Sequence, residues 1–459
     1  MYTVDFQKPI HVHFIGIGGI SMSGLAEVLL RRHFTVSGSD MHRSELTDHL
    51  KVNGAAIMIG QKAGNISDDI DLVVYTAAIH EDNPEFAEVK RRGIPLMTRA
   101  ELLGQIMANF PSSIAVAGTH GKTTTTSMLT HILMQAETDP TVSIGGMLDR
   151  IKGNIRVGQS DVFLTEACEY TNSFLSLYPR YSIILNVEED HMDFFKDLDD
   201  IKHSFRTFAS QTAEDGLIII NGDMDCTDDI LSGIDRRHVT FGLQPDNDYS
   251  AADITFDSMG NASYNLLVKG EPAGEISLCV KGRHNVMNSL AAIACSQAIG
   301  LSFDTIRDGL LSFGGTHRRF ELKGFLDQVT IVDDYAHHPT EIEATLTAAA
   351  DYPHDELWVV FQPHTYTRTK AFLHDFARVL TMADHVVIAE IFAAREPDTG
   401  LVSSAELADL IREAGTDVYH IKTFREIEDF LRSRLRGKDL LITMGAGNVV
   451  EVGEDLLKR

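Results

Sequence analysis

A short run of small and basic residues in the first third of the chain carries the clearest chemical signal. The apolar segment 113–117 leads into Gly-Thr-His-Gly-Lys-Thr-Thr at positions 118–124, and a segment with helical periodicity follows. Glycines let successive backbone N–H groups point at an anion, and the start of a helix adds its positive dipole end. Lys122 can reach the terminal phosphates of a nucleotide, and the hydroxyl of Thr123 can hold Mg²⁺. The sequence therefore predicts a phosphate-binding loop that handles ATP.

This loop is shorter than the usual phosphate clamp. Gly121 comes three positions after Gly118, so two residues lie between them, whereas the common pattern has four residues between its first glycine and its Gly-Lys pair. A plain glycine turn is the alternative, but such a turn does not require the lysine and the hydroxyl run behind it. The predicted ATP-binding residues of the loop are Gly118, Thr119, His120, Gly121, Lys122, Thr123 and Thr124.

Acidic residues and a histidine follow the next two strands that we expect. Glu166 comes just after a strand at 162–164, and the sequence Asp-His-Met-Asp at 190–193 follows a strand at 181–187. Taken singly, such residues are more often surface or structural groups, but their joint placement favours a site. Because Mg²⁺ prefers oxygen ligands, we predict that Thr123 and Glu166 hold the metal of ATP, and that His191 holds a second metal ion.

Two asparagines open a helix that we expect at 285–299. Asn285 and Asn288 are three residues apart, so they share one face of that helix. Their carboxamides can present a donor and an acceptor to adenine, while capping of the helix is the alternative for Asn285.

A second glycine-rich turn lies near the amino terminus. A strand at 11–17, glycines at 16, 18 and 19, a helix at 22–32, a strand at 34–39 and then Asp40 form one βαβ unit. Such a turn suits the pyrophosphate of a dinucleotide or of another nucleoside diphosphate. Ser21 stands where the third glycine of the dinucleotide fingerprint would fall, so a turn without any ligand is an equal alternative on this motif alone.

Composition and length limit the class of protein. A chain of 459 residues with 44% hydrophobic content predicts about three domains. Its 66 acidic and 40 basic residues give a net charge of -26, which argues against nucleic acid or an anionic membrane as the main partner. We find neither an apolar stretch of ~18 residues nor a signal-peptide pattern, and therefore predict a cytoplasmic protein. The four cysteines are widely spaced, which is typical of reduced thiols.

Short apolar runs alternate with longer helical patterns, which predicts an α/β protein with mostly parallel sheets. An antiparallel region is expected at about 246–280, where short alternating runs and glycines suggest hairpins. A third α/β block is expected from strands at 330–332, 357–361, 385–388 and 440–443.

These motifs, in this order, resemble the Mur ligase superfamily over nearly the whole chain. The shared motifs are the loop at 117–124, Glu166, the segment 190–193, His284 with Asn285 and Asn288, and the segment 318–321. Within that superfamily, the segments 14–24, 333–341 and 361–364 are most similar to members that add L-alanine to UDP-N-acetylmuramate for peptidoglycan synthesis.

The resemblance implies a fold of three domains. A Rossmann-like domain at 1–107 would bind the UDP-sugar, a central P-loop-type ATPase domain at 108–314 would have a mostly parallel sheet, and a Rossmann-like domain at 315–459 would bind the amino acid. It also implies an ATP- and Mg²⁺-dependent reaction that joins L-alanine to the lactyl carboxylate of UDP-N-acetylmuramate through an acyl phosphate. The enzyme would be a cytoplasmic monomer or homodimer that binds neither nucleic acid nor membrane.

Site residues carried over from the superfamily complete the prediction. The implied catalytic residues are Lys122, His191, Asp334 and His337, with His338 as a further candidate for handling the amine proton. Arg319 would contact the nucleotide, and Tyr335, His364 and Arg368 would bind the amino acid. The UDP-sugar would contact Gly18, Gly19, Ser21, Asp40 and Arg99.

Some alternatives stay open at this point. Thr365 replaces an arginine of some members, which leaves glycine or serine possible as the amino acid, and Cys168 replaces an aspartate found in many relatives. A recycling ligase that attaches a ready-made tripeptide to the same UDP-sugar shares the glycine-rich opening and the phosphate loop. A nucleotide-gated redox or sensor protein that binds NAD is a more distant alternative, against which Ser21 counts.

Overall fold

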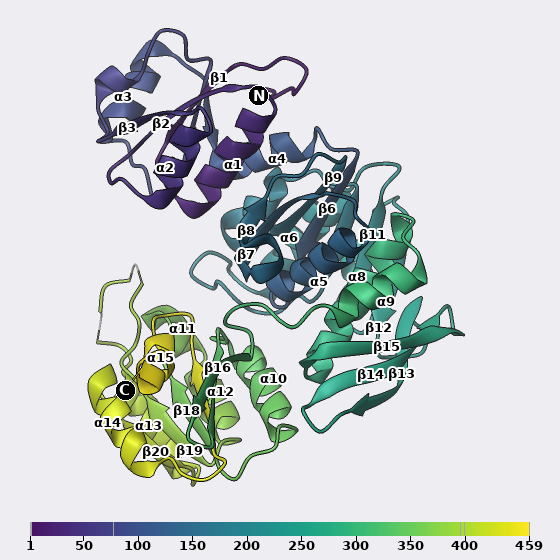
Figure 1. Cartoon of the computed structure of the whole chain (residues 1–459), viewed down its shortest axis with the longest axis vertical. Coiled ribbons are helices and arrows are strands. Elements are labelled where there is room, and N and C mark those ends of the chain that lie inside the picture. The colour runs from purple at the N-terminus through teal and green to yellow at the C-terminus, as the bar shows by residue number, and fades with distance from the viewer. Residues whose placement is uncertain (1, 77, 395, 399, 459) are drawn as a thin grey trace.

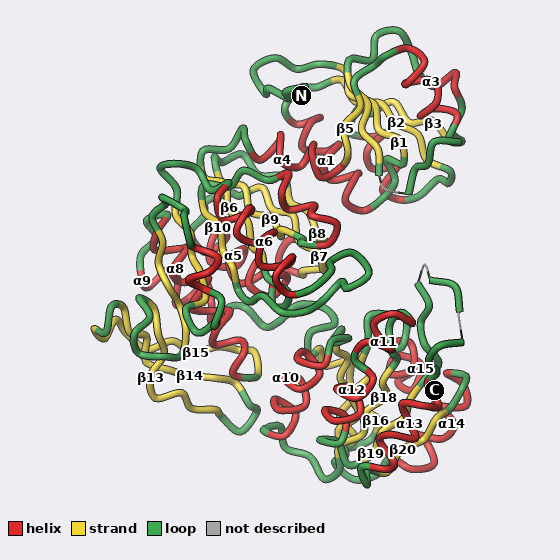
Figure 2. The backbone as a smooth tube through the Cα atoms, turned by 180° about the vertical axis from the view of Figure 1, so that it is seen from behind, coloured by secondary structure: helices red, strands yellow, loops and turns green. Residues whose placement is uncertain are grey.

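Three β-sheets, formed in chain order, organise the molecule into three α/β domains (Figure 1). The structure is a computed structural model and describes residues 2–76, 78–394, 396–398 and 400–458. Seen from behind, each sheet carries helices along its faces, as the α/β prediction requires (Figure 2). Among the described residues, no helix is both long and apolar enough to cross a lipid bilayer.

The first domain is a five-stranded parallel sheet of order β3-β2-β1-β4-β5. The predicted βαβ unit is confirmed as β1 (His11–Ile15), α1 (Ile20–Arg31) and β2 (Thr35–Asp40). The first strand is shorter than predicted because the chain turns at Gly16, whose φ of 84° is left-handed. The remaining elements are α2 (Glu45–Val52), β3 (Ala56–Ile59), η1 (Ala63–Asn65), β4 (Leu72–Tyr75), α3 (Pro84–Arg92), β5 (Leu96–Thr98) and α4 (Arg99–Met107).

The middle domain has a ten-stranded sheet of order β15-β14-β13-β12-β11-β10-β6-β9-β7-β8. Its parallel centre places β6 (Ser112–Ala117) between β9 (Val162–Ala167) and β10 (Tyr181–Ile184). The predicted hairpins are confirmed, because β13 (Tyr249–Phe256), β14 (Asn261–Val268) and β15 (Glu271–Lys281) pair antiparallel. Its other strands are β7 (Thr141–Leu148), β8 (Gly153–Arg156), β11 (Leu217–Asn221) and β12 (His238–Gly242).

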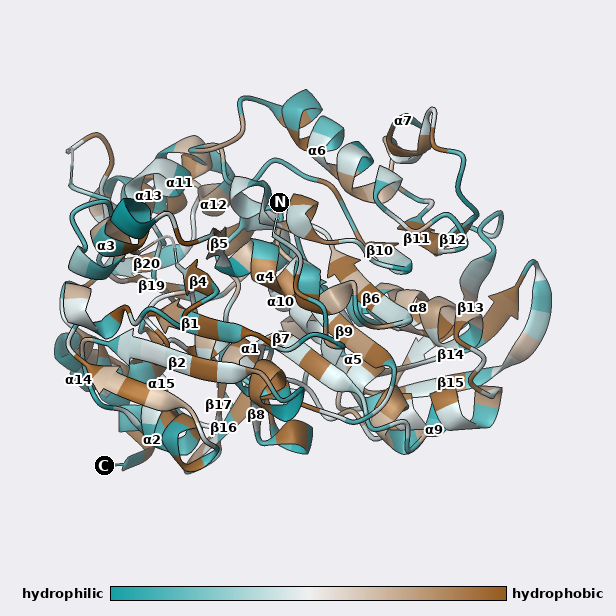
Figure 3. Cartoon of the chain, turned by 90° about the horizontal axis from the view of Figure 1, so that it is seen from above, coloured by the Kyte–Doolittle hydropathy of each residue, from teal (hydrophilic) through white to brown (hydrophobic). Residues whose placement is uncertain are grey.

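Most helices of the middle domain begin after strands, as in other parallel α/β folds, while α9 follows α8 directly. They are α5 (Lys122–Gln135), η2 (Asp149–Ile151), η3 (Tyr170–Ser176), α6 (Leu198–Ser210), α7 (Thr227–Leu231), α8 (Arg283–Ala298) and α9 (Phe303–Leu311). Figure 3 shows hydrophilic residues on outward-facing turns of α6 and hydrophobic residues along strands such as β1. This difference matches a helix that covers a sheet with one face and meets solvent with the other.

The third domain has a six-stranded sheet of order β16-β17-β21-β18-β19-β20. The four predicted strands are confirmed as β17 (Val329–Asp334), β18 (Leu357–Phe361), β19 (His385–Ile388) and β21 (Leu440–Met444). The sequence did not predict the edge strands β16 (Glu321–Leu326), which is antiparallel, and β20 (Asp417–His420). The helices are α10 (Pro339–Ala350), α11 (Tyr366–Ala371), α12 (Leu373–Leu380), α13 (Ser404–Glu413), α14 (Phe424–Arg434) and α15 (Val450–Lys458).

The first and middle domains share one apolar core. A single cluster of buried side chains runs from Phe14 and Met107 in the first domain to Phe163, Phe174 and Phe205 in the middle domain. Buried apolar residues of the third domain form clusters of their own. The first two domains are therefore joined by the packing of buried apolar side chains.

Gly104 marks the tightest approach at the seam between the first two domains. It lies in α4, and a Cβ added there would sit 1.8 Å from the backbone oxygen of Ser176 at the end of η3. We expect Gly104→Ala to lower the free energy of unfolding by about 1–3 kcal/mol, because backbone must move to admit the methyl group. The better helix propensity of alanine, about 1 kcal/mol, offsets only part of that cost.

Urea denaturation of the Gly104 variant measures this effect. Gly64→Ala is the matched control, since a Cβ at Gly64 would meet nothing within 4 Å. Equal unfolding midpoints for the two variants would show that the seam is looser than the structure has it.

Candidate active site

The phosphate loop joins the end of β6 to the start of α5. Gly118 and Gly121 have φ angles of 146° and 82°, which residues other than glycine rarely adopt. A Cβ at Gly118 would lie 2.9 Å from the Cβ of Leu185, and one at Gly121 would lie 2.6 Å from Oδ1 of Asn288. The two glycines thus let the loop pack against the end of β10 and against α8, and α5 begins at Lys122.

Lys122 is held by a carboxylate that the sequence analysis missed. Its Nζ donates to Thr119 O at 3.1 Å and to both oxygens of Glu169, at 3.1 and 2.9 Å. Burial favours the neutral amine, but the Glu169 charge outweighs burial, so the pKa of Lys122 is raised and the ammonium is retained. The only signal for Glu169 was its position two residues beyond the strand that contains Glu166, at the N-cap of η3.

Thr123, Glu166 and His191 lie beside this lysine. The hydroxyl of Thr123 donates to Oε2 of Glu166 at 3.1 Å, and Oε1 of Glu166 accepts from the backbone N–H of Gly145 at 2.6 Å. A hydroxyl beside a carboxylate is the donor set that Mg²⁺ prefers, so these residues fit the predicted metal. Burial lowers the pKa of His191, which favours the neutral imidazole that ligates metals, and its Nε2 lies 3.7 Å from Oε1 of Glu169.

A cavity of about 330 Å³ lies next to the phosphate loop, between the middle and third domains. Its walls include Gly121, Thr124, Asn285 and Asn288 from the middle domain. Arg319, Phe320, Asp334 and Glu341 line its other side. His284 lines it as well, and desolvation of its ring lowers the pKa of this histidine to about 4. Six of the ten predicted nucleotide residues border this cavity, namely His120, Gly121, Thr124, Asn285, Asn288 and Arg319, whereas Gly118, Thr119, Lys122 and Thr123 are not among its lining residues.

Asn285 does not cap α8, which was the alternative to its role at adenine. Gly282 is the N-cap of α8, and the Asn285 amide donates to Lys281 O at 2.7 Å. Asn288 in turn donates to Oδ1 of Asn285 at 3.0 Å. This chain of hydrogen bonds fixes both carboxamides at the cavity wall, because each has a partner that sets its orientation.

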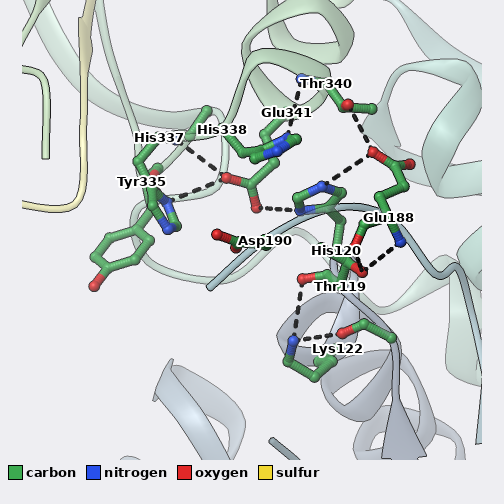
Figure 4. Close-up of polar contacts among 12 residues, drawn as sticks. Thr119, His120, Lys122, Glu188, Asp190, Tyr335, His337, His338, Thr340 and Glu341 are labelled. Atoms are coloured by element: carbon green, nitrogen blue, oxygen red, sulfur yellow. Dashed lines mark hydrogen bonds and ion pairs between the residues drawn. The ribbon is translucent and has the colours of Figure 1, made fainter. Parts of the chain in front are cut away.

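Three consecutive residues of the middle domain hold the third domain. Glu188 Oε2 accepts from the Thr340 hydroxyl at 2.7 Å, and the Glu189 backbone oxygen lies 3.0 Å from Nε2 of His338. Asp190 Oδ1 accepts from Nη2 of Arg368 at 2.8 Å. We call residues 188–190 the docking segment; some of these contacts are drawn in Figure 4.

The predicted amino-acid residues gather beside the docking segment. Nη1 of Arg368 lies 3.3 Å from Nδ1 of His364, and the His364 and His337 rings are 5.9 Å apart. Nδ1 of His337 lies 3.0 Å from the backbone oxygen of Tyr335. Burial alone would raise the pKa of the Asp190 carboxyl. The nearby charge of Arg368 outweighs burial, so this pKa lies well below its usual range.

Asp334 uses both carboxylate oxygens to shape the backbone. Oδ1 accepts from the Ala336 N–H at 2.7 Å, and Oδ2 accepts from the Phe320 N–H at 2.8 Å. Burial raises the pKa of Asp334 to about 6. Its geometry is that of a group that holds the 335–338 turn and the Arg319 segment in place beside the cavity.

In the first domain the five predicted UDP-sugar residues surround the start of α1. Gly19 is the N-cap of that helix, and the Gly18 N–H donates to Oδ2 of Asp40 at 2.8 Å. Nη1 of Arg99 donates to the hydroxyl of Ser21 at 3.1 Å. Asp40 thus stabilises the glycine turn, while Arg99 brings a cation to a helix N-terminus, where anions are favoured.

The boundary between the middle and third domains, which we call the docking seam, has a stability that depends on pH through His120. Its Nδ1 lies 3.2 Å from Oε1 of Glu341, and its Nε2 lies 3.5 Å from Oε2 of Glu188. Burial lowers the pKa of His120, but the two carboxylates outweigh it and raise the pKa to about 9. A raised histidine pKa stabilises the folded state fully below the unfolded value near 6.5, and the gain disappears as pH rises through about 9.

We expect His120→Gln to be less stable than the wild type at pH 6.5, and the difference to shrink as the pH approaches 9.5. Denaturant unfolding of both proteins across this range measures it. A difference that does not change with pH would show that His120 is neutral in the seam.

Comparison with known proteins adds to this geometry. The description "Mur ligase family, catalytic domain" matches residues 11–111, "Mur ligase middle domain" matches 116–296, and "Mur ligase, glutamate ligase domain" matches 318–447. Curated UDP-N-acetylmuramate--L-alanine ligases from Agathobacter rectalis and Lachnospira eligens are 59% and 56% identical over 459 residues, covering 100% of each chain.

The fold is similar to a solved structure as well. The crystal structure of UDP-N-acetylmuramate-alanine ligase MurC from Thermotoga maritima has a TM-score of 0.79 and 29% identity, covering 98% of this chain and 99% of that one. With three family descriptions matched in order and relatives above 50% identity over the full length, the chain belongs to the Mur ligase family.

Proposed function

We propose that this chain uses ATP to ligate L-alanine to the lactyl carboxylate of UDP-N-acetylmuramate, as a step of peptidoglycan synthesis. The observation that carries this proposal is the convergence of Lys122, His191 and Arg368 across one seam. His191 follows the docking segment, whose Asp190 binds Arg368, and Lys122 and His191 both approach Glu169. The full-length identity to alanine ligases supports the same substrates.

Activation of the sugar carboxylate is the first chemical task. A carboxylate is a poor electrophile until one oxygen becomes part of a phosphate leaving group, and the γ-phosphoryl group of ATP supplies it. Lys122 and the loop N–H groups would orient that group and neutralise its charge. Thr123 and Glu166 would hold one Mg²⁺ and His191 a second, and these ions would supply further charge neutralisation when bound.

Attack by the amine of alanine on the acyl phosphate is the second task. Arg368 would pair with the carboxylate of the amino acid, beside His364 and Tyr335. His337 is the best-placed proton acceptor, because Nδ1 is engaged by Tyr335 O and Glu341, which leaves Nε2 as the basic nitrogen. Docking of the third domain would keep water from the acyl phosphate.

The remaining assignments belong to the same proposal. We place domain boundaries at 1–107, 108–314 and 315–459, and assign the UDP-sugar to the start of α1, with Gly18, Gly19, Ser21, Asp40 and Arg99. A cytoplasmic location, and a monomeric or homodimeric state, go with this function.

Phosphate release tests the proposal directly. The purified chain, with ATP, Mg²⁺ and UDP-N-acetylmuramate, should release phosphate fastest with L-alanine, and more slowly with glycine or L-serine. Preference for L-Ala-γ-D-Glu-diaminopimelate would instead identify a recycling ligase. Absence of ADP with every amino acid, together with tight NADH binding, would overturn the proposal.

A further inference from the structure

Glu341 is a buried carboxylate at which three basic groups meet. Its Oε1 lies 3.2 Å from Nδ1 of His120 and 3.6 Å from Nη1 of Arg319. Its Oε2 accepts from the His337 N–H at 3.1 Å and lies 3.2 Å from Nδ1 of the same residue. Figure 4 shows this carboxylate between the His337 and His120 rings, and only 10% of its side chain is exposed.

The three groups come from separate parts of the site. His120 belongs to the phosphate loop, Arg319 to the segment that enters the third domain, and His337 to the turn before α10. Burial of a carboxylate is costly unless it is paired, and here the contacts with His337 and His120 outweigh that cost and hold the pKa of Glu341 well below its usual range. The carboxylate is therefore ionised whenever the seam is formed.

We propose that Glu341 is a positioning residue that couples the phosphate loop to the docked third domain. Through His120 it fixes the third domain on the loop, and through His337 and Arg319 it sets the groups that meet the amine and the nucleotide. This inference rests on the proposed function, but the contact that it names is a physical property of the folded chain.

A metal site is the competing interpretation of this seam. Ligand atoms of His120, Glu188 and His338 lie within 4.8 Å of one another. However, the two nitrogens of His338 already contact Glu189 O at 3.0 Å and the Thr340 N–H at 3.4 Å. The carboxylates beside His120 raise its pKa, and a protonated imidazole has no lone pair for a metal. The seam is therefore better explained by ion pairing.

Glu341→Gln keeps the shape of the side chain and removes its charge. We expect kcat to fall about 10- to 100-fold, because small displacements of reacting groups cost rates of that size. The KM for UDP-N-acetylmuramate should not change, since that substrate is assigned to the first domain. Phosphate released per alanine ligated should rise above the wild-type ratio, because a loosened seam admits water to the acyl phosphate.

Glu343→Gln is the matched control. It lies on the same helix, two residues away, and pairs at the surface with Arg378 at 3.1 Å, with about half of each side chain exposed. It should keep the wild-type kcat and phosphate ratio. Glu341→Asp, which retains the charge on a shorter stem, should recover part of the lost rate.

A double-mutant cycle tests the contact itself. Because Glu341 and His120 act through one ion pair, Glu341→Gln and His120→Gln together should cost less than the product of their separate losses in kcat. Should Glu341→Gln fail to fold, His120→Gln alone must show the raised phosphate ratio. Multiplicative losses, or a wild-type phosphate ratio in both variants, would overturn the inference.

A readout that needs no turnover separates this inference from the proposed function. Small-angle scattering with Mg²⁺ and a non-hydrolysable ATP analogue should give a larger radius of gyration for Glu341→Gln than for the wild type and Glu343→Gln. An inactive wild type that shows this difference would contradict only the proposed function. An active wild type with equal radii for all three proteins would contradict only the role of Glu341.

Discussion

Lys122→Ala should lower kcat/KM for ATP by about 10³-fold or more. The lysine is the first residue of α5, directly after the phosphate loop, and phosphoryl transfer is catalysed mainly by positioning and by neutralising charge. ADP formation at varied ATP, with UDP-N-acetylmuramate and L-alanine saturating, measures the loss. Retention of more than about a tenth of wild-type kcat/KM would show that Lys122 has no role in phosphoryl transfer.

The control for Lys122→Ala is a second substitution at Glu169, the carboxylate that pairs with Lys122. Only 3% of that side chain is exposed, so loss of Lys122 leaves a buried charge without its nearest partner, at a cost of about 3–5 kcal/mol in stability. Lys122→Ala combined with Glu169→Gln should recover the stability without recovering activity. Recovery of both would mean that the single variant was merely misfolded.

Arg368→Ala should lower kcat/KM for the amino acid about 100-fold. Nε and Nη2 of Arg368 already donate to Asp190. One further charge-assisted hydrogen bond, to the carboxylate of the amino acid, contributes about 1.5–3 kcal/mol, which accounts for a loss of this size. Initial rates at varied L-alanine, with the other substrates saturating, measure it. The KM for ATP should change little by comparison.

Two further variants make the Arg368 result specific. Arg378→Ala on α12 removes an exposed arginine of the same domain and should have no effect on the rate. Arg368→Lys keeps the charge but loses the fork, so it should recover only part of the activity. Full activity in Arg368→Lys would show that charge alone binds the amino acid.

Local patterns were enough to predict the phosphate loop and its strands. The sequence from 113 to 124 alone contains an apolar strand, two glycines and a lysine at a helix start, and each of these features acts over a few residues. The parallel sheets followed from the same kind of pattern. Strand ends differed by a few residues where a left-handed glycine such as Gly16 breaks the strand early.

Residues that act through distant partners could not be predicted in this way. Glu169 lies 47 positions from Lys122, Glu188 lies 152 from Thr340, and Asp190 lies 178 from Arg368. An acid after a strand is usually a surface group, and only the packed domains show which cation it faces. The same holds for Asp40, where sequence spacing gave no sign that its carboxylate binds the Gly18 N–H.

The first two domains share a core and the third domain has its own, and this difference makes the third domain exchangeable. The first and middle domains are fused by one apolar core, so a substitute for either would have to repack that interior. The last unit has an interior of its own and meets the docking segment through hydrogen bonds and ion pairs from a few side chains. We therefore expect that a graft which preserves those polar groups, and with them the cavity-lining Arg319, Phe320, Asp334 and Glu341, can bring a different acceptor pocket to the other two domains.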